Sequence, residues 1–164
     1  LQVWYLHLKA VSCGCEPQHT AFIKYLVLTG ICRSACSANQ YHFISKGRSY
    51  SEAQQYCRST HTDLATINSE ADMQNLLATV SGGYSGAAWI GLYRQSTPLW
   101  HWSLPDHQYY THGGTQYRNW QPGEPNNSGG SENCGSMGDN GKFSDTPCTV
   151  KKPFICFNCE FLEP

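Results

Sequence analysis

The sequence lacks any apolar stretch long enough to cross a membrane and lacks an excess of either charge. A membrane-spanning helix needs about 18 consecutive apolar residues, and no such run occurs. The formal net charge is only −1, so the chain has no basic excess with which to bind nucleic acid. Charged residues make up 14% of the chain and aromatic residues 13%, which excludes disorder as the main state. The 164 residues suffice for one domain with at most an appendage.

The chain has nine cysteines, an odd number. How many of them belong to the folded domain depends on how the N-terminal segment is interpreted. Residues 21–38 have the parts of a secretory signal peptide, with Lys24 before a short apolar stretch and small residues near the end. A buried strand over residues 21–32 is the alternative. The first interpretation makes residues 1–38 an upstream segment with a signal peptide, and it predicts a secreted, extracellular protein that begins near Asn39. Four cysteines leave with that segment, namely Cys13, Cys15, Cys32 and Cys36.

Two segments have the spacing of amphipathic helices. In the first, Ser49 and Glu52 form a capping box, in which the side chain of each can bond to the backbone of the other. The apolar face that follows repeats at i, i+3 and i+7 and consists of Tyr50, Ala53 and Cys57.

The second helix is predicted to begin at Asn68 or Ser69, with acidic residues in its first turn that complement the helix dipole. Its apolar stripe comprises Met73, Leu76, Leu77 and Val80, and residues 81–83 end it. Short strands are predicted at 41–44 (ended by Gly47), 87–93, 100–102 and 153–156. Early helices and late strands indicate an α+β domain.

Residues 121–147 contain few apolar side chains and many glycines, so we predict a long loop there. The segment is rich in carboxylate, amide and hydroxyl oxygens, which are the ligands that Ca²⁺ prefers. Zn²⁺ fits less well, because the loop has no histidine. A solvated acidic loop without a metal is the alternative. A cis bond between Glu124 and Pro125 would fix the backbone so that the side chains of Glu124 and Asn126 converge.

An ordered set of motifs identifies a family resemblance from about Tyr41 to Cys156. The set comprises Trp89-Ile90-Gly91-Leu92, Glu124-Pro125-Asn126 and the cysteines Cys57, Cys134, Cys148 and Cys156. Together they resemble a C-type lectin domain. The sequence around these motifs is similar to short secreted or receptor-type lectins of fishes and to macrophage mannose receptor modules.

The resemblance implies a double-loop α+β fold over residues 39–159, followed by a short tail at 160–164. It has two helices, small antiparallel sheets and a long Ca²⁺-binding loop. It also implies disulfides Cys57–Cys156 and Cys134–Cys148, although four cysteines by themselves allow three pairings. Trp89 and Trp120 are then expected in the core. Cys159 is left over and is a candidate for a covalent dimer.

The resemblance also implies a site for Ca²⁺ and a sugar, carried residue by residue onto Glu124, Asn126, Glu132, Ser144 and Asp145. The Glu-Pro-Asn triplet is the family's motif for mannose-type ligands, whereas Gln-Pro-Asp points to galactose. The expected function is Ca²⁺-dependent binding of mannose-type glycans on cell or microbial surfaces, in innate immune recognition. No second ion is expected, because Arg94, Asn127 and Asn133 stand where acids would be needed.

One departure from the family pattern leaves a second function open. The Trp-Asn-Asp motif reads Phe143-Ser144-Asp145 here, and serine is a shorter, poorer ligand that lacks the amide donor. The alternative is therefore a lectin-like module that binds protein and has lost the sugar. An enzyme is not expected, because His101, His107 and His112 accompany no nucleophile motif. The Asn126-Asn127-Ser128 sequon is expected to be unmodified, because a glycan there would block the site.

Overall fold

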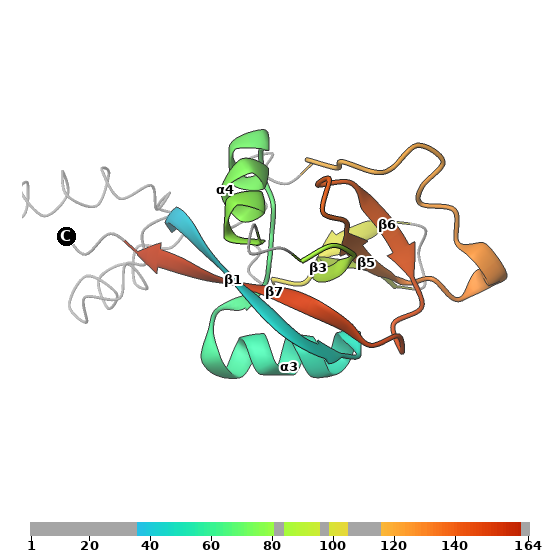
Figure 1. Cartoon of the computed structure of the whole chain (residues 1–164), viewed down its shortest axis with the longest axis horizontal. Helices are drawn as coiled ribbons and strands as arrows, with labels where there is room; N and C mark the ends of the chain where they lie inside the picture. Colours follow the sequence, from blue (N-terminus) through green and yellow to red (C-terminus); the bar gives the residue numbers. More distant parts are fainter. Residues whose placement is uncertain (1–35, 81–83, 96–98, 105–115, 162–164) are drawn as a thin grey trace, which may run out of the picture. The chain divides into compact units, whose positions relative to one another are not determined.

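The computed structural model describes residues 36–80, 84–95, 99–104 and 116–161, with side chains described from 40 to 158 (Figure 1). Residues 39–158 form one compact unit, and the description below concerns that unit. Several predictions lie outside the described residues: the signal peptide, the helix end at 81–83, and the side chains of the N-terminal cysteines, His107, His112 and Cys159.

The domain is built on one mixed sheet of seven strands in the order β1-β7-β3-β5-β6, with β2 paired to β7 and β4 to β3. The strands are β1 (Cys36–Arg48), β2 (Asp63–Leu64), β3 (Ala88–Arg94), β4 (Trp100–Trp102), β5 (Cys134–Met137), β6 (Phe143–Thr146) and β7 (Lys152–Phe161). Strands β3 and β7 run parallel, with Trp89 opposite Phe154. The β3–β5 and β5–β6 pairs are antiparallel, so the far end of the sheet is a hairpin.

Helix α3 (Tyr50–Thr60) has the predicted capping box. The backbone N–H and the hydroxyl of Ser49 both donate to Glu52 Oε2, at 2.9 and 2.8 Å. These bonds lower the pKa of Glu52. The predicted apolar face is buried, so both the start and the orientation of this helix are confirmed.

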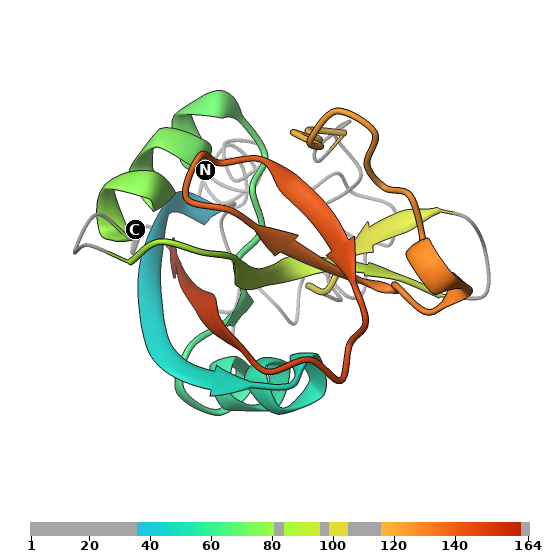
Figure 2. The same ribbon diagram turned by 45° about the vertical axis from the view of Figure 1, so that its right-hand side comes forward.

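Helix α4 (Glu70–Val80) confirms the second prediction and selects Ser69 as the capping residue. Ser69 Oγ accepts a hydrogen bond from the Asp72 backbone N–H at 3.1 Å. Of the four predicted stripe residues, Met73, Leu76 and Val80 are buried and Leu77 is half-buried. Figures 1 and 2 show α3 and α4 on either side of the long β1–β7 pair.

The core lies around Trp89, which is fully buried as predicted. Its ring meets the ring of Tyr50 edge-on at 5.7 Å, and its Nε1 donates to the Arg48 carbonyl at 2.9 Å. The implied disulfides are both present: Cys57–Cys156 joins α3 to β7, and Cys134–Cys148 joins β5 to the segment before β7. The first therefore ties a helix to the sheet, and the second ties β5 to the segment that leads into β7.

The prediction of a structureless loop over 121–147 is wrong in its second half, which contains β5 and β6. Strand β5 begins with three small residues, Cys134, Gly135 and Ser136, and at Gly135 it packs closely on β3. A Cβ added to Gly135 would lie 2.5 Å from Leu92 Cβ. Glycine, which usually marks a loop, is required at position 135 by the close approach of β5 to β3.

Two smaller predictions are also corrected. Strand β1 does not stop before Gly47 but runs through it to Arg48, which an edge strand tolerates because little packs on that position. Trp120 is half-buried instead of lying in the core. Its ring packs edge-on against Phe143 at 6.0 Å, and Phe143 is the fully buried member of that pair.

We expect Gly135→Ala to destabilise the domain by about 1–3 kcal/mol, because the added methyl group must push β5 away from β3. Denaturant unfolding measured by tryptophan fluorescence checks this. Gly47→Ala is the matched control, since its nearest neighbours, atoms of Lys151, lie 3.8 Å away. That substitution should change stability by less than about 0.5 kcal/mol. Equal effects of the two changes would contradict the packing argument.

Candidate functional site

The candidate site lies on the segment between Trp120 and Cys134, which is fastened at its start to β6. The Phe143 N–H donates to the Asn119 carbonyl and the Gln121 N–H donates to the Phe143 carbonyl, both at 2.8 Å. Trp120 forms a parallel bridge with Phe143. The segment then leaves the sheet, as the orange part of the chain in Figure 2 shows, and its return depends on side chains.

The turn at Glu124-Pro125-Asn126 has the predicted cis peptide bond between Glu124 and Pro125. Asn126 Nδ2 donates to Glu124 Oε1 at 2.6 Å, so the two side chains converge as the sequence predicted. Asn127 follows in the left-handed region with φ of 49°, a conformation that asparagine tolerates better than most residues. The turn therefore presents an amide and a carboxylate side by side.

Asp145 on β6 holds this turn against the sheet. Its carboxylate accepts the backbone N–H groups of Asn126, at 3.1 Å to Oδ1, and of Asn127, at 2.8 Å to Oδ2. The side chain is only 5% exposed. A buried carboxylate is stable only with such partners, so Asp145 and the turn need each other.

The carboxylate of Glu124 lies against that of Asp145. Hydrogen bonding between this carboxyl group and that of Asp145, followed by burial, raises the pKa of Glu124, because the bond favours a proton on Glu124. Glu124 Oε2 is buried and has no hydrogen-bond partner among the described residues. Two adjacent carboxylates with a free buried oxygen form an arrangement that a cation would stabilise.

Glu132 approaches the same group from the other end of the turn. Its Oε2 accepts the Ser128 backbone N–H at 2.7 Å, and Asn126 Oδ1 accepts the same N–H at 2.8 Å. The Glu132 N–H donates in turn to Asn127 Oδ1 at 3.1 Å. Oxygens of Asn126 and Glu132 are thus brought together around one backbone donor.

Ser144, a predicted site residue, has its described contact with β5 and not with the Glu124–Asn127 turn. Its hydroxyl lies 3.3 Å from Ser136 Oγ, and Ser136 Oγ lies 3.2 Å from Thr146 Oγ1. Successive side chains of a strand point to opposite faces, so Ser144 and its neighbour Asp145 face different ways. Ser144 belongs to a row of hydroxyls across the β5–β6 hairpin.

The donor set fits a hard cation. Carboxylate and amide oxygens surround the turn, and Ca²⁺ takes six to eight oxygen ligands in flexible geometry. Among the residues that the structure describes, no three His, Cys, Asp or Glu side chains converge closely enough to hold an ion alone. The ligand set would therefore combine the acids with the amide oxygen of Asn126 and with oxygens that come from outside the chain.

Arg94 is one of the residues on which the prediction of no second Ca²⁺ ion rests. Its Nε and Nη2 donate to Asn133 Oδ1 at 3.1 and 3.0 Å, and its backbone N–H donates to the Asn133 carbonyl at 2.9 Å. The guanidinium also lies over the Trp100 ring, 6.0 Å from its centroid. A positive side chain is therefore fixed at the base of the loop.

A comparison with protein-family models gives a match to the lectin C-type domain over residues 46–158, which is more than half of the chain. The chain belongs to the C-type lectin domain family. The match covers α3, α4 and the whole segment that carries Glu124, Asn126, Glu132 and Asp145.

Relatives of this lectin domain include both larger and similar-sized proteins. It is 33% identical over 130 residues to E-selectin of Oryctolagus cuniculus, covering 75% of this chain and 22% of that protein. It is 31% identical over 169 residues to the C-type lectin BfL-2 of Bungarus fasciatus, covering 98% and 94% of the two chains. The chain thus spans about a fifth of E-selectin, the larger relative.

A solved structure has the same fold. The C-type carbohydrate-recognition domain of cow CD23, determined in the presence of an oligosaccharide, is 26% identical with a TM-score of 0.62. The superposed region covers 74% of this chain and 88% of the CD23 domain. Among the described residues of the lectin domain, no helix is both long and apolar enough to span a membrane.

Sequence reasoning found the acids of the lectin domain's loop but missed the residues that position them. Asn127 binds Asp145 through its N–H and Glu132 through its side chain, and Ser128 joins Asn126 to Glu132. Only the run of asparagine and serine, which favours tight turns, could have indicated this role.

We expect Asp145→Ala to release the turn, because two backbone donors lose a charged acceptor, and such bonds contribute about 1.5–3 kcal/mol each. Amide hydrogen exchange at Asn126 and Asn127, measured in EDTA, should accelerate by about tenfold or more. Ser144→Ala changes the adjacent residue without touching these donors and should leave both amides protected. Similar exchange in the two variants would show that Asp145 does not anchor the turn.

Proposed function

We propose that this lectin domain binds mannose-type glycans in a Ca²⁺-dependent manner, through Glu124, Asn126, Glu132 and Asp145, with Ser144 as a weak fifth contributor. The observation that carries the proposal is the contact between the carboxyl groups of half-buried Glu124 and buried Asp145, beside the side chain of Asn126. The chain's membership in the C-type lectin family and its likeness to an oligosaccharide-associated domain support it.

The paired side chains match the chemistry of a sugar hydroxyl. A hydroxyl both donates and accepts, and here Asn126 Nδ2 is a donor and Glu124 Oε1 an acceptor, 2.6 Å apart. In the unliganded turn these atoms bond to each other, so a pair of vicinal hydroxyls can exchange with that bond without leaving either unsatisfied. When bound, Ca²⁺ would supply open coordination positions for the same hydroxyls.

The setting of the domain is proposed as well. Two disulfides indicate an oxidising compartment, which agrees with a secreted, extracellular protein, and the glycan partners suggest innate immune recognition. We expect no enzymatic activity. Because one such site binds a monosaccharide weakly, useful avidity requires several copies, and Cys159 is the candidate for a covalent dimer.

The second candidate function is a lectin-like module that binds protein. Ser144 favours it, because its hydroxyl lies beside Ser136 and has no amide group to offer to an ion or a sugar. The two candidates differ in one respect that is easily measured, the dependence of sugar binding on Ca²⁺.

We expect the protein to be retained on immobilised mannose with Ca²⁺, released by EDTA, and not retained on galactose. Glu124→Gln removes one of the facing charges and should weaken retention by about tenfold or more, equivalent to about 1.4 kcal/mol. Asp139→Asn is the control, because that acid is exposed and lies outside the turn. Retention that survives EDTA would exclude the coordination mechanism, and no retention on any sugar would favour protein binding.

Replacing Ser144 by Asn should strengthen Ca²⁺ or mannose binding, because it restores an oxygen ligand and an amide donor. Each is worth about 1–2 kcal/mol, or roughly tenfold in affinity. Calorimetric titration with Ca²⁺ and then with mannose separates the two gains, and Thr146→Asn, two residues along the same face of β6, controls for a general effect of asparagine. An unchanged affinity in Ser144→Asn would place this residue outside the site.

A further inference from the structure

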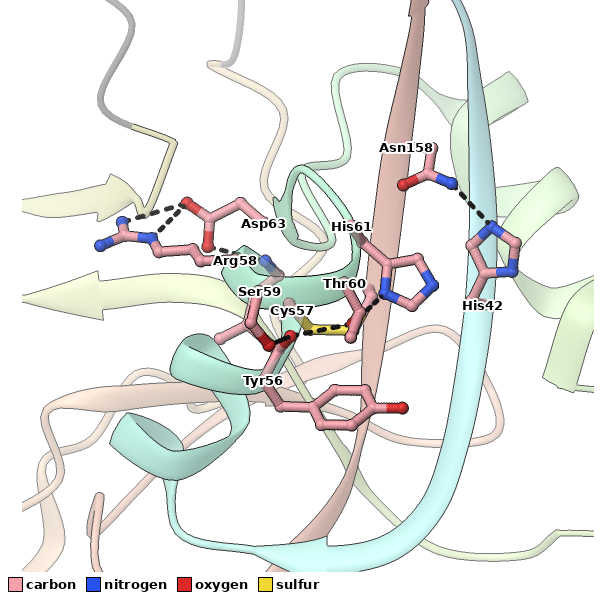
Figure 3. The surroundings of a disulfide bond; sticks show 11 residues. His42, Tyr56, Cys57, Arg58, Ser59, Thr60, His61, Asp63 and Asn158 are labelled. Atoms are coloured by element: carbon pink, nitrogen blue, oxygen red, sulfur yellow. Dashed lines mark hydrogen bonds and ion pairs between the residues drawn. A yellow bond between two sulfur atoms is a disulfide. The ribbon is translucent and has the colours of Figure 1, made fainter.

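Two histidines and an asparagine meet at the opposite end of the sheet from the lectin site. His42 lies on β1, His61 caps the C-terminal end of α3, and Asn158 lies on β7 (Figure 3). The two imidazole rings have their centroids 4.6 Å apart and are inclined at 43°. In the strand order, β3 and β5 separate this end from β6, which carries Asp145.

The backbone holds His61 firmly. Its N–H donates to the Cys57 carbonyl at 2.7 Å, and the next residue, Thr62, donates to the Phe157 carbonyl at 3.0 Å. Cys57 is itself bound to Cys156. The ring is oriented by its Nδ1, which lies 2.8 Å from Thr60 Oγ1. The other ring nitrogen of His61, Nε2, is directed toward the His42 ring in Figure 3.

His42 is held from the other side by Asn158, whose Nδ2 lies 3.3 Å from His42 Nε2. An asparagine amide presents either nitrogen or oxygen after a half-turn, so Asn158 can offer its oxygen at the same place. The charged side chains drawn nearby, Arg58 and Asp63, are paired with each other at 3.1 Å. Among the contacts that the structure describes for these two rings, none is a carboxylate.

The separation of the rings fits a shared metal ion. Metal–nitrogen bonds to histidine are about 2.0–2.1 Å long, so two imidazoles at tetrahedral to right angles on one ion have centroids about 4.5–5 Å apart. Imidazole nitrogen suits Zn²⁺, Cu²⁺ and Ni²⁺, whereas Ca²⁺ prefers oxygen. Both rings are half-buried, so the pair is accessible while its backbone is fixed.

We propose that His42 and His61 form a binding site for a divalent transition-metal ion of the Zn²⁺ class, with Asn158 Oδ1 as third ligand and water completing the coordination. The site ties β1, α3 and β7 together and is independent of the Ca²⁺ loop. It does not rest on the proposed carbohydrate binding.

The test is a Zn²⁺ titration of the full, disulfide-bonded chain at saturating Ca²⁺, followed by NMR at the individual histidine rings. This site-specific readout is needed because the full chain contains other histidines and cysteines. His42 and His61 should respond together with one dissociation constant. The exposed His101, whose only ring contact in the described structure is Tyr93 at 6.0 Å, should not respond with that constant.

Three variants decide the outcome, each checked for folding by its backbone NMR spectrum. His61→Gln should weaken the Zn²⁺ response of His42 by about tenfold or more, as expected for loss of a metal ligand, whereas His101→Gln should not affect it. Asn158→Asp should tighten binding, because a carboxylate is a stronger ligand than an amide. A His42 response that is unchanged in His61→Gln, or the absence of any response, would overturn the site. A lack of tightening in Asn158→Asp would overturn the third ligand.

Discussion

One buried carboxylate connects the fold of this domain to its loop. Asp145 lies on β6, directly opposite Gly135 of β5, and accepts two backbone N–H groups from the Glu124–Asn127 turn. The position of Asp145 depends on the close approach of β5 to β3, which only glycine at position 135 allows. Packing in the sheet thus determines where the loop can attach, and the loop's long polar sequence is ordered by an acceptor that comes from outside it.

The same interaction makes the loop a place for a cation. The carboxyl group of Asp145 accepts two backbone N–H groups of the turn, and it also acts on Glu124, the first residue of that turn, whose pKa it raises. The anchoring of the loop and the accumulation of negative charge are therefore a single effect. With serine or asparagine at position 145, the turn would be held less strongly and the negative charge that favours Ca²⁺ would be smaller.

Local signals in the sequence were sufficient for the helices and for the convergence of the turn. The capping box at Ser49 and the 3.6-residue periodicity act within one or two turns of chain, so the start of α3 and the buried faces could be predicted without knowing their neighbours. The start of α4 could be narrowed only to Asn68 or Ser69, and the structure selects Ser69. The disulfide pairing could not be derived in this way, because four cysteines allow three pairings. It came from the family resemblance, and the structure confirms it.

The errors arose where distant backbones meet. Gly135 is typical of a loop and carries no periodic signal, and the reason that position 135 is glycine is Leu92, which lies more than forty positions earlier. The proposed role of Ser144 rests on its place in a motif, and in the structure its hydroxyl lies beside Ser136 of β5. A motif fixes the order of residues along the chain, whereas strand pairing fixes which of them can contact the same ligand. Asp145 and Ser144 are adjacent along the chain, but their side chains have different partners in this structure.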